Sequence, residues 1–246
     1  MQFWQQIQLA MMMLTRLPIG RLHDPVPKLA EAAWAFPLVG LVISGIGWCV
    51  LQLALVTGLS AVLASLVALV AMVWATGALH EDGLADFADG IGGGRDASHC
   101  LEIMRDSRIG SYGVVALVFM IGLKTAALAD IATTQTLAAL LLTGVASRLM
   151  MLVVLRILPA ARADGLGYDA SSPLTSALLP GAVVIVVLAI ILGSMAVPVL
   201  IVMGLASAIP TLLAMRKIKG QTGDVLGTVQ NSAETAGFVA LSVLIA

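Results

Sequence analysis

Residues 80–113 read HEDGLADFADGIGGGRDASHCLEIMRDSRIGSYG, and they carry half of the protein's 14 acidic residues. Long apolar runs lie directly before and after this segment, so the charge density rises and falls abruptly. Carboxylates beside a bilayer are costly unless they have a function. The segment therefore indicates a functional site at the edge of a membrane. Its acidic residues are Glu81, Asp82, Asp86, Asp89, Asp96, Glu102 and Asp106.

Three of these acids, Asp82, Asp86 and Asp89, share one face if the segment is helical. Successive helical residues turn by about 100°, which places the carboxylates within roughly 60° of arc. Carboxylates this close repel one another, and a divalent cation between them removes the repulsion. Mg²⁺ commonly binds one or two carboxylates together with substrate phosphates. The spacing predicts a Mg²⁺ site for a phosphate-bearing substrate, and the alternative is a solvated acidic face at the membrane surface.

The composition excludes an ordinary soluble protein. Of the 246 residues, 60% are hydrophobic and 11% are charged, and the mean hydropathy is +1.04. These values indicate a polytopic membrane protein. The net charge of -1 leaves no basic surface for a nucleic-acid polymer.

The predicted fold is all-α, a bundle of about seven transmembrane helices in a single integral membrane domain, residues 1–246. A span needs about 20 apolar residues. The candidate spans are 33–56, 58–79, 112–130, 136–158, 177–197, 198–215 and 228–246. The apolar run in residues 1–28 is too short and too often interrupted to span a membrane. Its apolar residues recur at helical spacing, opposite three glutamines. They predict an amphipathic helix in the interface, in contact with membrane lipid.

The basic residues predict the orientation. Eleven of the 13 lie before the first span, after the second or the sixth, or around the end of the fourth, and the three opposite turns have none. Positive residues favour the cytoplasmic side. We therefore expect a protein of the cell inner membrane with a cytoplasmic N-terminus and three cytoplasmic loops, 80–111, 159–176 and 216–232. The first would be the acidic active-site loop and the last a second site loop.

Candidate phosphate ligands follow the aspartates. The run Gly90-Ile-Gly-Gly-Gly-Arg95 could bring backbone N–H groups and a guanidinium to a phosphate, although a helix C-cap would use the same residues. Arg105 and Arg108 are one helical turn apart and suit a pyrophosphate, with Asp106 available to a metal. Ser107 lies between them. Surface ion pairs are the alternative here.

Two cations, Lys124 and Arg148, fall inside expected spans, where a charge is a functional hypothesis by default. Asp130 is a candidate partner for Lys124, and Arg148 is a candidate for the site. His80 lies roughly 160° from the aspartate face, which favours a supporting hydrogen bond or interfacial anchoring over metal binding.

A second compact polar motif, Gly220-Gln-Thr-Gly-Asp-Val-Leu-Gly227, lies on the same predicted side. Its glycines flank Thr222 and Asp224, which makes it a second candidate segment for the site. The alternative is a small turn closed by a side-chain hydrogen bond.

These motifs together resemble the cobalamin synthase family, the adenosylcobinamide-GDP ribazoletransferases. The resemblance covers nearly the whole chain. It is carried by His80-x-Asp-Gly-Leu-Ala-Asp-x-x-Asp-Gly90, Leu101-Glu-Ile-Met-Arg-Asp-Ser-Arg-Ile-Gly110-x-x-Gly113 and Gly220–Gly227, with Thr15-Arg-Leu-Pro18, Phe36-Pro-Leu-x-Gly40 and Glu234 in support. Two residues depart from the expected pattern: Glu81 replaces an apolar residue and Lys219 replaces a glycine.

The resemblance implies the last assembly stage of cobalamin (vitamin B12) biosynthesis. The family joins adenosylcobinamide-GDP to α-ribazole or its 5′-phosphate, forms adenosylcobalamin or its 5′-phosphate, releases GMP and requires Mg²⁺. Asp82, Asp86 and Asp89 would then hold Mg²⁺, Asp89 would also take the hydroxyl proton, and Arg105 and Arg108 would neutralise phosphate charge during transfer. The expected substrate-binding residues are His80, Arg95, Asp106, Ser107, Arg148, Thr222, Gly223 and Asp224.

Two other classes of membrane protein are alternatives. A CDP-alcohol lipid phosphotransferase also uses clustered aspartates, but its pattern needs an aspartate where this chain has Leu79 and an arginine where it has Asp86. A transporter would carry its charges near the bilayer midplane, often in repeated halves, and no convincing internal repeat is present. The sequence leaves open whether the chains form a homo-oligomer.

Overall fold

The structure is a computed structural model that describes residues 2–132 and 136–245, and within these residues it is helical apart from one isolated bridge between Ala160 and Gln221. The predicted all-α fold is confirmed. The α-helices are α1 (Gln2–Leu14), α2 (Leu29–Ala32), α3 (Phe36–Val56), α4 (Ala61–Thr76), α5 (Leu79–Gly93), α6 (Ala97–Ile103), α7 (Ser111–Ile131), α8 (Thr136–Ile157), α9 (Leu166–Asp169), α10 (Leu179–Leu192), α11 (Ala196–Lys217) and α12 (Gly223–Ile245). Short 3₁₀ turns lie at η1 (Ala33–Ala35), η2 (Thr175–Leu178) and η3 (Gly193–Met195).

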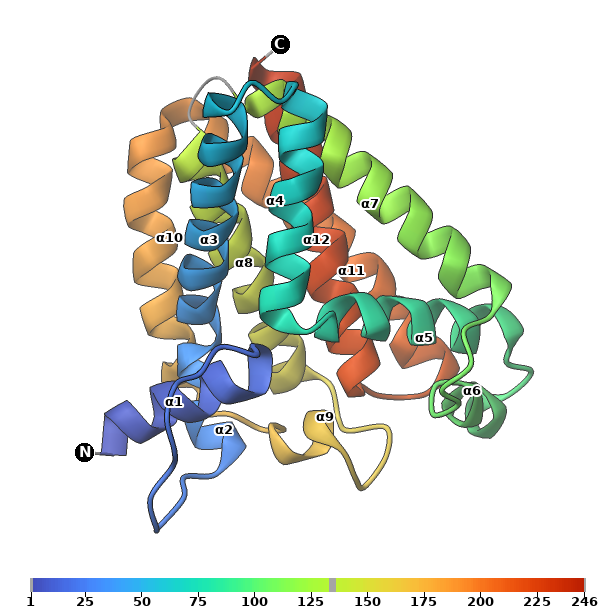
Figure 1. Ribbon diagram of the computed structural model, residues 1–246. Coiled ribbons are helices and arrows are strands. Elements are labelled where there is room, and N and C mark those ends of the chain that lie inside the picture. Colours follow the sequence, from blue (N-terminus) through green and yellow to red (C-terminus); the bar gives the residue numbers. More distant parts are fainter. Residues whose placement is uncertain (1, 133–135, 246) are drawn as a thin grey trace.

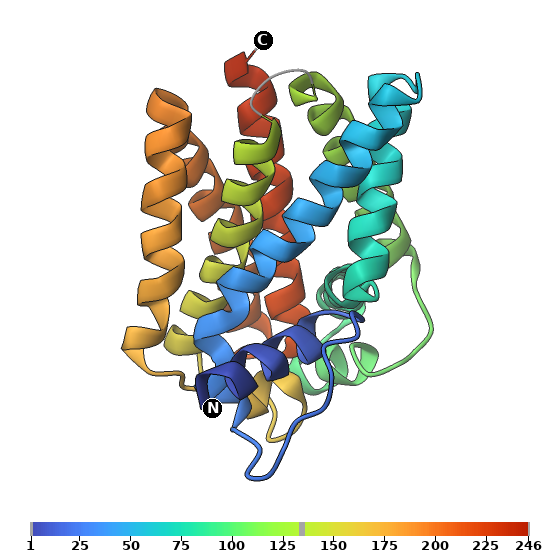
Figure 2. The ribbon, with the colours of Figure 1, turned by 60° about the vertical axis from the view of Figure 1, so that its left-hand side comes forward.

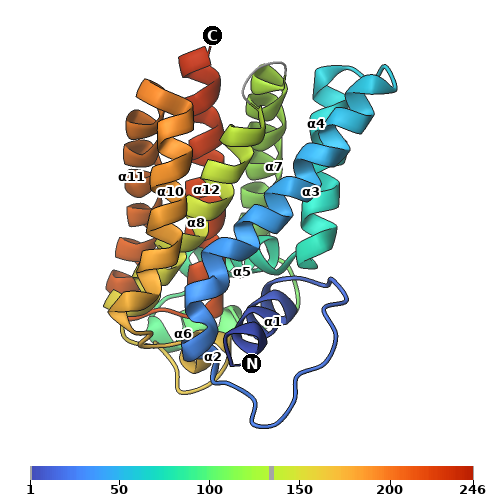
Figure 3. The same cartoon turned by 90° about the vertical axis from the view of Figure 1, so that its left-hand side faces the viewer.

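Seven helices, α3, α4, α7, α8, α10, α11 and α12, run side by side as a bundle (Figures 1 and 3). By length and composition, four helical runs in the described residues can cross a membrane: Leu29–Val56, Ser111–Ile131, Thr136–Ile157 and Thr175–Lys217. The last run contains both α10 and α11. A fifth candidate exists if α4 and α5 are taken together. The chain is thus a membrane protein by these criteria, and the count of seven spans stays a prediction.

The expected span 58–79 ends early, because the chain turns sharply after α4. Gly77 and Ala78 both adopt left-handed backbone conformations, with φ of 65° and 57°. A helix cannot continue through two such residues. As a result α5 is bent by 89° from α4 and crosses the end of the bundle instead of following it (Figure 1).

Helix α12 forms the centre of the bundle, packed against α5, α7, α8 and α11. Its side chains include the buried polar residues Gln230, Asn231 and Glu234. This explains why the last expected span begins with polar residues. They face other helices, so they need no contact with lipid.

The other polar segments gather at one end of the bundle, together with the N-terminus, while the C-terminus lies at the opposite end (Figures 1 and 2). We call this the polar end; it comprises α1 and residues 15–28, 77–110, 158–175 and 218–223. Helix α1 lies across it and is anchored by polar bonds, with Trp34 Nε1 donating to Gln6 Oε1 at 2.7 Å. Phe3 and Trp4 remain exposed, as expected of a helix that enters the membrane interface.

Candidate active site

The site is built where α5 crosses α12 at two glycines, Gly83 and Gly227. A Cβ atom on Gly83 would lie 3.1 Å from the Cα of Asp224, and one on Gly227 would lie 3.1 Å from the carbonyl oxygen of His80. The hydroxyl of Thr228 donates to the Gly83 carbonyl at 3.2 Å. Both motifs therefore need glycine at these positions, because any side chain would separate the two helices.

This crossing brings Asp82 and Asp86 of α5 to Asp224 at the start of α12, and we call these three residues the acidic cluster. Partial burial, followed by repulsion from Asp82 and then Asp224 and Asp89, raises the pKa of Asp86 to about 7, against a smaller lowering by Arg162. Negative charge here is therefore only partly compensated. A divalent cation is the kind of ligand that such a cluster favours.

Asp89 occupies a different environment from the other two aspartates of α5. It is 8% exposed, and its carboxylate accepts hydrogen bonds from the backbone N–H groups of Gly110 at 2.7 Å and Gly113 at 2.9 Å. These amides lie at the N-terminus of α7, where the helix dipole favours an anion. A Cβ atom at either glycine would collide with the carboxylate. Asp89 thus joins α5 to α7.

The expected three-aspartate face is therefore divided, although its three residues lie on α5 as predicted. Within residues 2–132 and 136–245, no three His, Cys, Asp or Glu side chains are arranged as a ready-made metal site. The Mg²⁺ ligands stay a prediction. The prediction did not foresee that α7 would supply two amides to Asp89, because these donors lie 21 and 24 residues away in sequence.

Arg162 is the site residue that sequence analysis missed. Its Nη2 lies 3.6 Å from Asp224 Oδ2 and its Nε lies 3.7 Å from Asp164 Oδ1. Backbone bonds hold this loop against the second motif: Ala161 N donates to Gln221 O, and Gln221 N donates to Pro159 O, both at 2.8 Å. The available signal was only that Arg162 lies in one of the three basic loops.

The predicted phosphate ligands lie further out at the polar end, in ion pairs. Arg105 donates two hydrogen bonds to Asp164 at 2.6 and 2.8 Å, so α6 is tied to the loop after α8. Arg108 pairs with Asp106 at 2.6 Å, and its hydrogen bonds hold the pKa of Asp106 below the usual range. The side chains of both arginines are exposed, as are Arg95 and Ser107.

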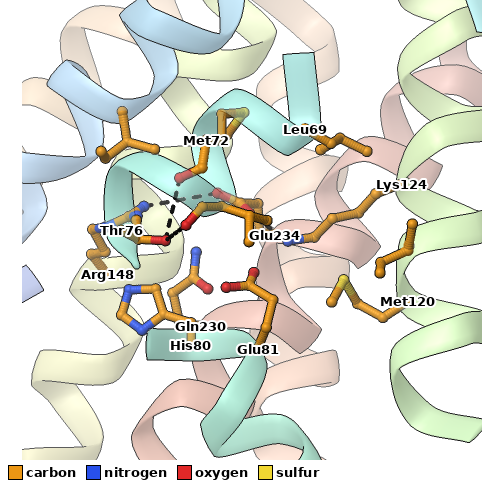
Figure 4. A pocket seen from close by; sticks show the side chains of 13 residues that line it. Leu69, Met72, Thr76, His80, Glu81, Met120, Lys124, Arg148, Gln230 and Glu234 are labelled. Atoms are coloured by element: carbon orange, nitrogen blue, oxygen red, sulfur yellow. Dashed lines mark hydrogen bonds and ion pairs between the residues drawn. The ribbon is translucent and has the colours of Figure 1, made fainter. Parts of the chain in front are cut away.

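Three charged residues meet inside the bundle instead: Lys124 of α7, Arg148 of α8 and Glu234 of α12 (Figure 4). Lys124 Nζ lies 2.6 Å from Glu234 Oε2 and also donates to Asn231 Oδ1 at 2.8 Å. The suggested pairing of Lys124 with Asp130 is therefore wrong. Spacing along one helix could not reveal that α12 packs beside α7.

Arg148 completes this group, with its Nη1 3.8 Å from Glu234 Oε1 and donating to the Gly144 carbonyl at 3.0 Å. Glu81 and His80 reach toward it from α5 and line the same small cavity of about 30 Å³ (Figure 4). We call Glu81, Lys124, Arg148 and Glu234 the buried ion cluster. Arg148 is only 1% exposed, so it does not lie in the acidic cluster.

A larger cavity of about 230 Å³ opens beside the acidic cluster. Asp82, Asp224, Arg162 and His80 are its polar side chains, and His80 thus lies between the two cavities. The remaining lining is mostly apolar and comes from α1, α2, α3, α5, α8, α9 and α12. We call this the active-site cavity.

Known proteins match the chain over almost its full length. Residues 6–242 match the protein family described as cobalamin-5-phosphate synthase. The chain belongs to the cobalamin-5-phosphate synthase family. This confirms the resemblance on which the sequence interpretation rested, and no solved structure matched the chain.

Relatives of this chain carry the name adenosylcobinamide-GDP ribazoletransferase. The protein of Bradyrhizobium diazoefficiens is 42% identical over 245 residues, covering 93% of this chain and 89% of the relative. That of Mesorhizobium japonicum is 39% identical and covers 98% of this chain and 94% of the relative. That of Azorhizobium caulinodans is 43% identical, with coverage of 89% and 88%.

The second motif, Gly220–Gly227, leads into the start of α12. The Thr222 hydroxyl donates to Asp224 Oδ2 at 3.1 Å and accepts from the backbone N–H of Val225 at 3.4 Å. The side-chain-closed turn considered for this motif is therefore present. It also fixes Asp224 against α5, so the turn and the acidic cluster are parts of one structure.

Proposed function

We propose that this protein is an adenosylcobinamide-GDP ribazoletransferase. It joins adenosylcobinamide-GDP to α-ribazole or α-ribazole 5′-phosphate, forms adenosylcobalamin or its 5′-phosphate and releases GMP. Membership of the cobalamin-5-phosphate synthase family and the names of relatives at 39–43% identity support this assignment. The observation that carries it is the meeting of the two family motifs of α5 and α12 in one acidic cluster beside a cavity.

We further propose that Asp82, Asp86 and Asp224 hold Mg²⁺. Three carboxylates with incomplete compensation suit a hard cation, and burial followed by repulsion from the neighbouring carboxylates raises the pKa of Asp86. When bound, Mg²⁺ would supply positive charge that stabilises a diphosphate at this site. Asp89, with both oxygens bonded to α7, would position α5 instead of binding the metal directly.

The transfer replaces a phosphoanhydride bond with a phosphodiester bond. The ribazole hydroxyl attacks the phosphorus bound to the corrinoid side chain, the bond to the bridging oxygen breaks, and GMP leaves with that oxygen. The hydroxyl proton passes to a carboxylate of the site. Contacts from Gly110 and Gly113 make Asp89, the earlier candidate for this role, less available.

Cations at the polar end would neutralise the phosphates. Arg162 lies beside Asp224, and Arg105 and Arg108 have exposed carboxylate partners that a phosphate could replace. We propose that this end faces the cytoplasm, because eight of the 13 basic residues lie in the segments assigned to it and three more lie in the last turns of α8 and α11. Nucleotide substrates and Mg²⁺ would then reach the site from the cytoplasm.

The test is GMP release by the purified protein in lipid nanodiscs. Adenosylcobinamide-GDP is supplied with α-ribazole or with its 5′-phosphate, with and without Mg²⁺. We expect stoichiometric GMP and cobalamin product only when Mg²⁺ is present. Absence of GMP with both acceptors would contradict the proposal, and turnover of a CDP-alcohol with a lipid would assign the protein to the other phosphotransferase class.

A further inference from the structure

The active-site cavity has a chemically mixed lining. Asp82, Asp224, Arg162 and His80 are its polar side chains, and most of the others are apolar and come from α1, α2, α3, α5, α8, α9 and α12. The apolar residues include Met13, Leu14, Leu29, Phe36, Met151 and Leu226. A ligand in this cavity would place an apolar group against these side chains and a polar group beside the acidic cluster.

The volume limits which part of the substrates can enter. A cavity of about 150 Å³ lined by apolar side chains accepts benzene, so about 230 Å³ suits a flat bicyclic ring. A corrinoid is far larger and must remain outside. Guanine is bicyclic, but its edge carries several hydrogen-bond donors and acceptors, and burying these against apolar side chains without partners would cost free energy.

We propose that this cavity binds the benzimidazole base of the acceptor nucleoside, a flat bicyclic ring with a mostly apolar edge. This inference rests on the proposed function and assigns the acceptor half of its site. The ribose then lies at the polar side chains, where its hydroxyl meets the acidic cluster. The GDP moiety binds outside the cavity, toward the exposed arginines of the polar end.

The assignment gives helix α1 a role in substrate binding. Met13 and Leu14 come from its last turn, so the helix that lies across the polar end also closes the base subsite. Met13 is half-buried and unbranched, which makes it a suitable site for changing the cavity size without disturbing the buried core. Its neighbour Met12 is 41% exposed and does not line the cavity, so it provides a matched control.

The experiment compares Met13→Trp with Met12→Trp. Met13→Trp should fill the cavity and raise the KM for α-ribazole at least about tenfold, while the KM for adenosylcobinamide-GDP stays within about twofold. A riboside of unsubstituted benzimidazole is smaller than α-ribazole because its base lacks the two methyl groups of dimethylbenzimidazole. With Met13→Trp, the KM for this smaller acceptor should rise less than the KM for α-ribazole. Met12→Trp should leave both KM values unchanged. A rise in the KM for adenosylcobinamide-GDP, or no change in either, would overturn the assignment.

Equilibrium dialysis of α-ribazole separates this inference from the proposed function. One outcome is that the unmodified protein releases GMP while the Met13→Trp variant binds α-ribazole with the same affinity as the unmodified protein. In that case the cavity assignment fails and the function stands. If the protein releases no GMP but binds α-ribazole, and Met13→Trp weakens binding about tenfold, the function fails and the cavity assignment stands.

Discussion

The acidic cluster and the buried ion cluster both take their acids from α5 and α12, yet their charges are arranged in opposite ways. In the buried ion cluster two cations, from α7 and α8, meet two acids, and Glu234 contacts both Lys124 and Arg148. In the acidic cluster three carboxylates share one nearby cation, Arg162, whose Nη2 lies 3.6 Å from Asp224 Oδ2. Balanced charge inside a bundle connects helices, whereas unbalanced charge at its end favours binding of a cation.

The depth of each cluster follows from its position on α12. Asp224 lies in the first turn of the helix, and Glu234 lies ten residues later, about 15 Å along the axis. A charge at the deeper position must be paired, because burial without a partner is costly. The shallower position allows exchange with solvent, substrates and ions, and the following predictions test this difference.

The largest effect is expected from Asp82→Asn or Asp224→Asn. Each change removes a proposed Mg²⁺ ligand with almost no change in size, and transfer should fall at least about 100-fold. Thermal stability should not decrease, because repulsion within the cluster is reduced. The measurement is GMP release alongside thermal unfolding. Asp164→Asn, which changes an exposed acid at the same end, is the control and should cost far less. Near-normal turnover in both cluster variants would contradict the metal assignment.

Glu234→Gln should act mainly on stability. It removes the acid that contacts both Lys124 and Arg148 and leaves Glu81 as the one acid of the cluster, and breaking a buried pair typically costs about 3–5 kcal/mol. Thermal unfolding and the yield of folded protein measure the effect, and adding Lys124→Met should recover part of it. The folded fraction should retain most of its activity. If Glu234→Gln leaves stability unchanged but lowers activity as much as Asp82→Asn does, Glu234 takes part in catalysis and this prediction is wrong.

The acidic cluster should also depend on pH. The pKa of Asp86 is raised to about 7, so its carboxyl is mostly protonated below that pH and Mg²⁺ must displace the proton. Apparent Mg²⁺ affinity should fall up to about tenfold per pH unit between pH 7 and pH 5.5. Without Mg²⁺, protonation should instead stabilise the fold as pH falls from 8 to 5, because the folded state binds the proton more tightly. Asp86→Asn should remove most of both dependences, and a flat Mg²⁺ affinity across this range would contradict the assignment.

The smallest effect is expected at Lys219, where the family resemblance leads us to expect glycine. Lys219 adopts a left-handed conformation with φ of 61°, which is unfavourable for a residue with a Cβ atom. Lys219→Gly should therefore raise the free energy of unfolding by about 0.5–1 kcal/mol and leave transfer unchanged. Thermal unfolding measures this, and Lys217→Gly, in the last turn of α11, should lower stability instead. Destabilisation by Lys219→Gly would show that its side chain has a role.

The sequence was sufficient to predict the helical membrane fold, the acidic helix and the meeting of its motif with the Gly220–Gly227 motif. These features follow from local patterns: apolar run length, i and i+4 spacing, and the placement of basic residues. The partners of Asp89, Lys124 and Asp224 were not predictable, since each comes from a helix or loop far away in sequence. The bend at Ala78 was also missed, because a non-glycine residue gives no sign of a left-handed conformation.

The most direct test of the account is Mn²⁺ binding to the purified protein, measured by electron paramagnetic resonance with GDP present. Mn²⁺ substitutes for Mg²⁺ at sites of carboxylate and phosphate oxygens. We predict one or two bound ions with magnetic coupling to phosphorus, lost in the double variant Asp82→Asn with Asp224→Asn and retained in folded Glu234→Gln. Undiminished binding in the double variant, or loss only in Glu234→Gln, would contradict the claim that the acidic cluster is where the metal meets the diphosphate.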